Sequence, residues 1–191
     1  MRLIASRVAT VGSCPDYAAK ASHVRYDLLK ILLVDDNPYM RVLLAEILRA
    51  IGVTHIYEAS DGTEGLQCLR DRAIDVVMTD LSMQPLDGID FVRLLRTSPD
   101  SSNAMIPVVM ITGHSTLARV HEARDAGVNE ILTKPLTARG VIERLHQAIS
   151  NPRPYVRAEG YFGPDRRRRK DPLFRGPGRR VTDKDIAPLE V

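Results

Sequence analysis

The stretch Ile31-Leu32-Leu33-Val34-Asp35-Asp36 decides the fold of this 191-residue chain. Four consecutive apolar residues without polar alternation are typical of a strand buried on both faces of a parallel sheet. Two acids follow it directly, and Asn37 and Pro38 then favour the start of a helix. The stretch therefore predicts a buried strand that ends in carboxylates and passes into a helix.

The same alternation of short apolar runs and longer segments of helical period recurs along the chain. It indicates strand and helix units that form a parallel sheet covered on both faces. We expect strands at residues 30–34, 55–59, 76–79, 108–112 and 130–133. We expect helices at residues 38–50, 62–72, 88–96, 116–126 and 138–149. The strand at 55–59 is the most polar, so it should lie at an edge of this doubly wound α/β sheet.

Composition limits the class of protein. No stretch reaches the roughly 18 apolar residues that a membrane-spanning helix needs. The two cysteines, Cys14 and Cys68, form neither a disulfide framework nor a metal-binding spacing. We therefore expect a cytoplasmic protein without a membrane span.

Charge divides the chain into three parts. Residues 28–150 carry 12 basic and 16 acidic side chains, whereas residues 151–191 carry 11 basic and 6 acidic ones and six prolines. A basic, proline-rich segment with few apolar residues buries too little surface to offset its ordering entropy. We expect one domain at 28–150, a weakly ordered extension at 1–27 and a disordered tail at 151–191.

Polar side chains follow four of the expected strands at their carboxyl ends: Asp35, Asp36, Asp80, Thr112 and Lys134. In an open parallel sheet these ends meet at one edge, where functional groups collect. Each residue alone has an ordinary explanation, as a helix cap, a strand residue or a solvated lysine. Three clustered carboxylates repel one another unless a cation is present, and oxygen ligands are those that Mg²⁺ prefers. The combination predicts a Mg²⁺ site.

These residues resemble the receiver domain of two-component response regulators over residues 29–149. The similarity rests on an apolar strand with paired acids, an Asp followed by Met and Gly, a Thr with a small neighbour, and Lys-Pro. In this chain the pattern comprises residues 31–36, Asp80, Met83, Gly88, Thr112, Gly113, Lys134 and Pro135. The resemblance is to stand-alone receivers of the chemotaxis type, and it implies a flavodoxin-like sheet of strand order 2-1-3-4-5.

The resemblance implies that Asp80 accepts a phosphoryl group from a sensor histidine kinase or a histidine phosphotransfer protein. Asp36, Asp35, Asp80 and the backbone carbonyl of Ser82 are then expected to hold Mg²⁺. No enzymatic activity beyond the chain's own phosphorylation and dephosphorylation is expected. A dehalogenase-type phosphatase needs a second Asp at the position of Ser82, which disfavours that alternative.

The resemblance also assigns the switch. Lys134 should pair with Asp80 and then with the phosphoryl group. Thr112 should donate its hydroxyl to that group, and Gly113 should leave room for it. Pro135 should follow a cis peptide. Ile131 replaces a frequent aromatic residue, so an aromatic form of the switch is not expected.

Departures from the family pattern lie in the loops. Gln84 stands where many receivers have proline, with Pro85 one place later, so this loop is expected to bend differently. Ser82 and His114 occupy positions that tune the lifetime of the acyl phosphate. His114 has an equal alternative, simple exposure to solvent at a helix start.

Output is expected through protein binding by the fourth helix, fifth strand and fifth helix. The expected surface includes Arg119, Glu122, Arg124, Glu143 and Arg144. Two alternatives stay open: a phosphate sink without output, and contact of Arg166, Arg167, Arg168 and Arg169 with nucleic acid or anionic lipid. A merely solvated basic tail is the simpler account of that arginine run.

Overall fold

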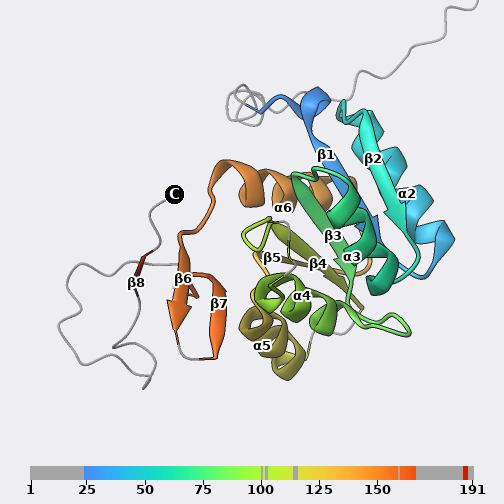
Figure 1. Cartoon of the computed structure of the whole chain (residues 1–191). Helices are drawn as coiled ribbons and strands as arrows, with labels where there is room; N and C mark the ends of the chain where they lie inside the picture. Colours follow the sequence, from blue (N-terminus) through green and yellow to red (C-terminus); the bar gives the residue numbers. More distant parts are fainter. Residues whose placement is uncertain are drawn as a thin grey trace, which may run out of the picture.

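The computed structural model describes residues 24–99, 101, 103–113, 116–158, 160–166 and 187–188. Its main sheet is parallel, in the order β2-β1-β3-β4-β5 (Figure 1). The strands are β1 (Lys30–Val34), β2 (His55–Ala59), β3 (Val76–Asp80), β4 (Val108–Thr112) and β5 (Glu130–Thr133). The predicted fold class and strand order are confirmed, and β2 lies at an edge as its polarity indicated.

Four α-helices connect these strands, a fifth follows β5, and together these helices cover both faces of the sheet (Figure 1). They are α2 (Pro38–Ala50), α3 (Gly62–Asp71), α4 (Gly88–Thr97), α5 (Leu117–Ala126) and α6 (Ala138–Ser150). Leu69, Phe91 and Ala123 place α3, α4 and α5 in the core on one face. Leu44 and Leu145 place α2 and α6 in the core on the other.

The alternation along β1 supplies both cores. Ile31 and Leu33 belong to the core under α2 and α6, whereas Leu32 and Val34 belong to the core under α3, α4 and α5. All four side chains are buried, which is why this strand needs apolar residues at every position. Its first polar residues follow where the strand leaves the sheet, and this positions the acids at the carboxyl edge.

The structure describes only the last residues of the extension that was expected to be weakly ordered. A 3₁₀ turn, η1 (Tyr26–Leu28), precedes β1, and Tyr26 packs against the core under α2 and α6. The hydroxyl of Thr54 donates to the carbonyl of Asp27 at 2.8 Å. The packing of Tyr26 and the hydrogen bond from Thr54 thus hold the described part of the extension against the domain, while residues 1–23 lie outside the described residues.

The expectation of a disordered tail is wrong for the segment that follows Ser150. Strands β6 (Tyr155–Ala158) and β7 (Tyr161–Pro164) form an antiparallel hairpin, and β8 (Ala187–Pro188) pairs with β6. Tyr155 and Val156 are buried. We call residues 152–158 and 160–166 the C-terminal hairpin. Two buried side chains and contacts with α4 and α5 compensate for the ordering entropy that the composition alone does not offset.

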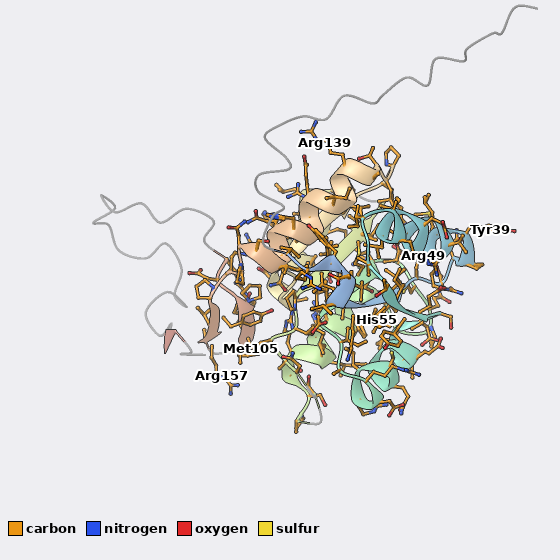
Figure 2. All side chains as sticks on the ribbon, turned by 90° about the horizontal axis from the view of Figure 1, so that it is seen from above. Tyr39, Arg49, His55, Met105, Arg139 and Arg157 are labelled. Carbon is orange, nitrogen blue, oxygen red and sulfur yellow. The ribbon has the colours of Figure 1, made fainter. Side chains whose placement is uncertain are left out.

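Several side chains point away from the body of the molecule. Figure 2 shows Tyr39 at the start of α2 and Arg157 on the C-terminal hairpin in such positions. Within the part of the chain that the structure describes, no helix is long and apolar enough to cross a membrane.

Candidate functional site

Asp80 ends the central strand β3 and is almost completely buried. Its Oδ2 accepts a hydrogen bond of 2.7 Å from the backbone N–H of Ser82. Its Oδ1 lies 2.6 Å from the Nζ of Lys134. Both carboxylate oxygens therefore have a donor, one of them charged, and the side chain is held in a single orientation.

Lys134 follows β5, and the peptide bond between it and Pro135 is cis, as predicted. Its backbone N–H donates to the carbonyl of Thr112 at 2.8 Å, which links the ends of β4 and β5. Its ammonium lies 3.9 Å from Oδ2 of Asp35, in addition to its contact with Asp80. Lys134 thus supplies one positive charge that is shared between two carboxylates.

Asp35 is buried at the end of β1. Its Oδ1 accepts from the N–H of Asn37 at 2.8 Å, whereas Oδ2 is buried without a hydrogen-bond partner among the described residues. Burial raises the pKa of the Asp35 carboxyl, and the charge of Asp80 acts in the same direction against the Asn37 hydrogen bond and Lys134. This oxygen of the carboxylate therefore has the Lys134 charge nearby but no hydrogen-bond donor among the described residues.

Arg41 holds the backbone of the acidic turn, which sequence reasoning did not identify. Its Nη1 donates to the carbonyl of Asp35 at 2.7 Å, and its Nε pairs with Glu58 at 3.1 Å. Arg41 lies one turn into α2 and Glu58 on β2, so the contact depends on the packing of two elements. A helix arginine gives no local signal of such a role.

Two glycines near Asp80 differ in how much space they leave. A Cβ at Gly88 would overlap the backbone carbonyl oxygen of Asp80, so the start of α4 approaches the end of β3 directly. A Cβ at Gly113 would meet only the Cδ of Lys134, at 4.0 Å. Position 88 therefore has no room for a side chain. The described residues leave open space at position 113, where Gly113 is predicted to leave room.

The other predicted residues take different places. Thr112 is buried at the end of β4, and Ile131 packs against the core under α3, α4 and α5. Asp36 and Ser82 are exposed. His114 lies outside the described residues, so both of its interpretations, a role in the lifetime of the acyl phosphate and simple exposure to solvent, stay open. The peptide bond between Gln84 and Pro85 is also cis.

The predicted convergence of three carboxylates is not present as a ready-made cluster. No three His, Cys, Asp or Glu side chains within the described ranges are grouped so as to hold a metal ion. Lys134 instead contacts Asp80 and Asp35. The residues still fit Mg²⁺, because that ion keeps several waters and takes one or two carboxylates. Asp35, whose Oδ2 has no hydrogen-bond donor among the described residues, and the neighbouring Asp80 provide such a pair.

Comparison with known proteins covers the same part of the chain. The family model described as "Response regulator receiver domain" matches residues 31–147. The Chemotaxis protein CheY of Pseudomonas aeruginosa is 37% identical over 119 residues, 62% of this chain and 94% of that protein. A probable chemotaxis protein CheY of Rhizobium etli is 33% identical over 121 residues, 63% of this chain and 89% of that protein.

A solved structure of the chemotaxis response regulator CheY4 of Vibrio cholerae has a TM-score of 0.58 at 25% sequence identity. It covers 63% of this chain and 98% of that one. These similarities span the residues that build the main sheet and its carboxyl edge. The chain therefore belongs to the response regulator receiver domain family, whose members are phosphorylation-dependent signalling modules.

Proposed function

We propose that Asp80 is the phosphoacceptor of this receiver domain. The observation that carries this proposal is the buried Asp80 carboxylate, fixed between Lys134 and the N–H of Ser82 at the carboxyl edge of the sheet. A carboxylate oxygen of Asp80 attacks the phosphorus of a phosphohistidine or a small acyl phosphate. A phosphorus–oxygen bond to Asp80 forms as the bond to the donor nitrogen or oxygen breaks, and the donor keeps that electron pair.

Lys134 then acts in two ways. It holds Asp80 before transfer, and its ammonium stays within reach of a phosphoryl oxygen afterwards. The buried hydroxyl of Thr112 is placed at the end of the neighbouring strand to donate to the same group. Gly113 adds no side chain there. Together these residues stabilise the charge that the phosphoryl group brings.

Asp80, Asp36 and Asp35 are the side chains that we expect to hold Mg²⁺, with exposed Asp36 binding directly, Asp35 directly or through water, and the carbonyl of Ser82 completing the protein's share. When bound, the ion supplies positive charge that screens the anionic donor from the carboxylates. Asp35 is the residue most in need of that charge, because its Oδ2 is buried and has no hydrogen-bond partner in the described structure.

The donor is a histidine kinase or a histidine phosphotransfer protein, and we infer that it docks on the first two turns of α2. This helix begins two residues after Asp36, so its exposed side chains adjoin the entrance to the site. Tyr39 is 84% exposed, and Val42 and Leu43 continue the same apolar stripe. Val42→Asp should slow transfer from the protein donor and leave acetyl phosphate reactivity unchanged.

Output is proposed to pass through α5, β5 and α6. The charged residues expected there form ion pairs, of which Arg119 with Glu122 at 2.7 Å and Arg144 with Glu130 at 3.2 Å are examples.

Arg166 of the basic run pairs with Asp125 at 3.5 Å and lies over the Tyr161 ring. That engagement favours a structural use of Arg166 over contact with nucleic acid or lipid.

Incubation with acetyl phosphate and Mg²⁺, followed by intact mass measurement, tests this proposal. We expect the wild-type chain to gain the mass of one phosphoryl group and Asp80→Asn to gain none. The matched control is Asp75→Asn, directly before the same strand, which should behave as wild type. Equal modification of Asp80→Asn would contradict the assignment.

A further inference from the structure

The C-terminal hairpin docks at the beginning of β4 and β5, the end of the sheet opposite Asp80 (Figure 1). The Tyr155 hydroxyl is placed to donate to the carbonyl of Ile106 at 3.3 Å and to Oδ1 of Asn129 at 3.2 Å. Arg153 donates to the carbonyls of Val128 and Asn129. The hairpin therefore contacts the residues that lead into these two strands.

At two glycines, the backbone of the hairpin packs directly against the backbone of the domain. Gly127 ends α5 with a φ of 99°, and a Cβ there would lie 3.0 Å from the carbonyl oxygen of Phe162. A Cβ at Gly163 would lie 2.9 Å from the Cα of Gly127. Neither position has room for a side chain without displacement of the hairpin. Close packing of this kind tolerates little relative movement.

Arg96 joins α4 to the same contact. It is 4% exposed, and its guanidinium donates to the carbonyls of Gly127 at 3.1 Å and Ala104 at 2.7 Å and to Oδ1 of Asn129 at 3.1 Å. It also lies 5.3 Å from the centre of the Tyr155 ring. The side chain of Asn129 thus accepts from α4, from the hairpin and from the N–H of Val108.

Strands β4 and β5 run from this network to the phosphoacceptor site. Their far ends carry Thr112 and Lys134, the two residues proposed to contact the phosphoryl group. The strands are tied at both ends, by Asn129 N–H to Val108 carbonyl at 3.0 Å and by Lys134 N–H to Thr112 carbonyl at 2.8 Å. Five residues of strand span about 16 Å, so the two sites lie at opposite ends of one short, hydrogen-bonded unit.

We propose that the C-terminal hairpin is an intramolecular clamp that docks more tightly on the unphosphorylated domain, so that phosphorylation of Asp80 loosens it. This inference rests on the proposed function of Asp80. A phosphoryl group on Asp80 takes over the Lys134 ammonium from the carboxylates of Asp80 and Asp35, and the strand that precedes Lys134 begins at the tightly packed hairpin interface. The coupling must be reciprocal, so weaker docking must raise the affinity for a phosphoryl mimic.

Two tyrosines of the hairpin provide a matched test. Tyr155→Phe removes a hydroxyl that bonds to the domain, whereas Tyr161→Phe removes one that bonds within the hairpin, to the carbonyl of Pro164 at 2.7 Å. Beryllofluoride with Mg²⁺ is the probe, and its affinity is measured for the full chain and both variants. We expect Tyr155→Phe to bind about threefold more tightly and Tyr161→Phe to match wild type.

Hydrogen exchange supplies the reciprocal measurement. Beryllofluoride should speed amide exchange in residues 155–164 of the wild-type chain. Arg153→Met should raise both the exchange of these amides and the affinity for the probe. Equal affinities for wild type, Tyr155→Phe and Arg153→Met, with faster hairpin exchange in the variants, would overturn the clamp alone. Failure of the wild-type chain to bind beryllofluoride would overturn the assignment of Asp80 and the clamp together.

Discussion

The two ends of strands β4 and β5 stabilise positive charge in different ways. At the carboxyl end, Lys134 is partly exposed and faces the carboxylates of Asp80 and Asp35. At the amino end, Arg96 is buried and is surrounded by carbonyl and amide oxygens and the Tyr155 ring, with no ion pair to a carboxylate in the described chain.

This difference means that the Lys134 site can change its ion pairs, whereas the Arg96 site keeps one arrangement. A cation near solvent easily exchanges one anionic partner for another, because water and ions screen its charge during the exchange. A buried guanidinium satisfied by backbone carbonyls has no alternative partner nearby, and loss of any bond leaves a buried polar group unpaired. Burial lowers the pKa of Arg96, and the neighbouring Tyr155 and Tyr161 oppose that effect.

The largest effect is expected at the carboxyl end for Gly88→Ala. Its Cβ would overlap the carbonyl of Asp80, so the start of α4 must move, at a cost of about 3 kcal/mol in the free energy of unfolding. Gly113→Ala is the control, because the nearest atom to its Cβ is 4.0 Å away. Urea unfolding of both variants gives the two values, and equal losses would contradict the proposed difference in space.

Removal of the lysine charge comes next. Lys134→Met should slow phosphorylation by acetyl phosphate about 100-fold, because one preorganised cation no longer stabilises the transferred group. Lys30→Met makes the same change at the start of β1, the other end of the sheet, and should leave the rate unchanged. Time courses of intact mass measure both rates. A slow Lys30→Met would indicate a general effect of lysine loss.

The amino end is tested by Arg96→Ala. Several buried carbonyls lose their donor, so we expect a loss of about 2 kcal/mol in the free energy of unfolding. Arg93 lies on the same helix, is half-exposed and pairs with Asp90 at 2.8 Å. Arg93→Ala should change stability by less than about 0.5 kcal/mol. Similar values for the two arginines would mean that burial is not decisive.

The sheet and most of the site could be predicted because their signals are local. Each buried strand is built around a short apolar run, and its functional residue lies at or directly after its end, as Asp80 ends β3 and Lys134 follows β5. The contacts at the amino end have no such signal. Arg96 meets Gly127 and Asn129 from 31 and 33 residues away, and only the folded chain brings them together.

The C-terminal hairpin had a local signal that the prolines and arginines obscured. Tyr155-Val156 begins β6 and Tyr161-Phe162 begins β7, and the short connection between these strands contains Gly160, with a φ of 70°. Such a connection between short apolar runs is a hairpin signal. The composition favoured disorder, whereas burial of Tyr155 on the domain surface decided the outcome.

The smallest effect concerns pH. Burial raises the pKa of the Tyr155 phenol, against the charge of Arg96 and the hydrogen bond with Asn129. The folded chain then keeps this proton at a pH where the unfolded chain has released it. The contribution of Tyr155 to stability is therefore complete below its ordinary pKa of about 10 and is lost as the pH rises above it.

Urea unfolding of wild type and Tyr155→Phe at about pH 8 and about pH 10.5 measures this change. The difference between the two proteins should be about 1 kcal/mol at the lower pH and smaller at the higher one. A difference that grows with pH would mean that the phenol ionises more readily in the folded chain.

Chemical location of the phosphoryl group tests the account most directly. Borohydride reduces an acyl phosphate to an alcohol, so a phosphorylated aspartate becomes homoserine and can be found by peptide mass spectrometry. After treatment with acetyl phosphate and Mg²⁺, we predict homoserine at position 80 and unchanged aspartate at positions 35 and 36. Homoserine at either of those positions, or unreduced Asp80 in a chain that carries phosphate, would contradict the central claim.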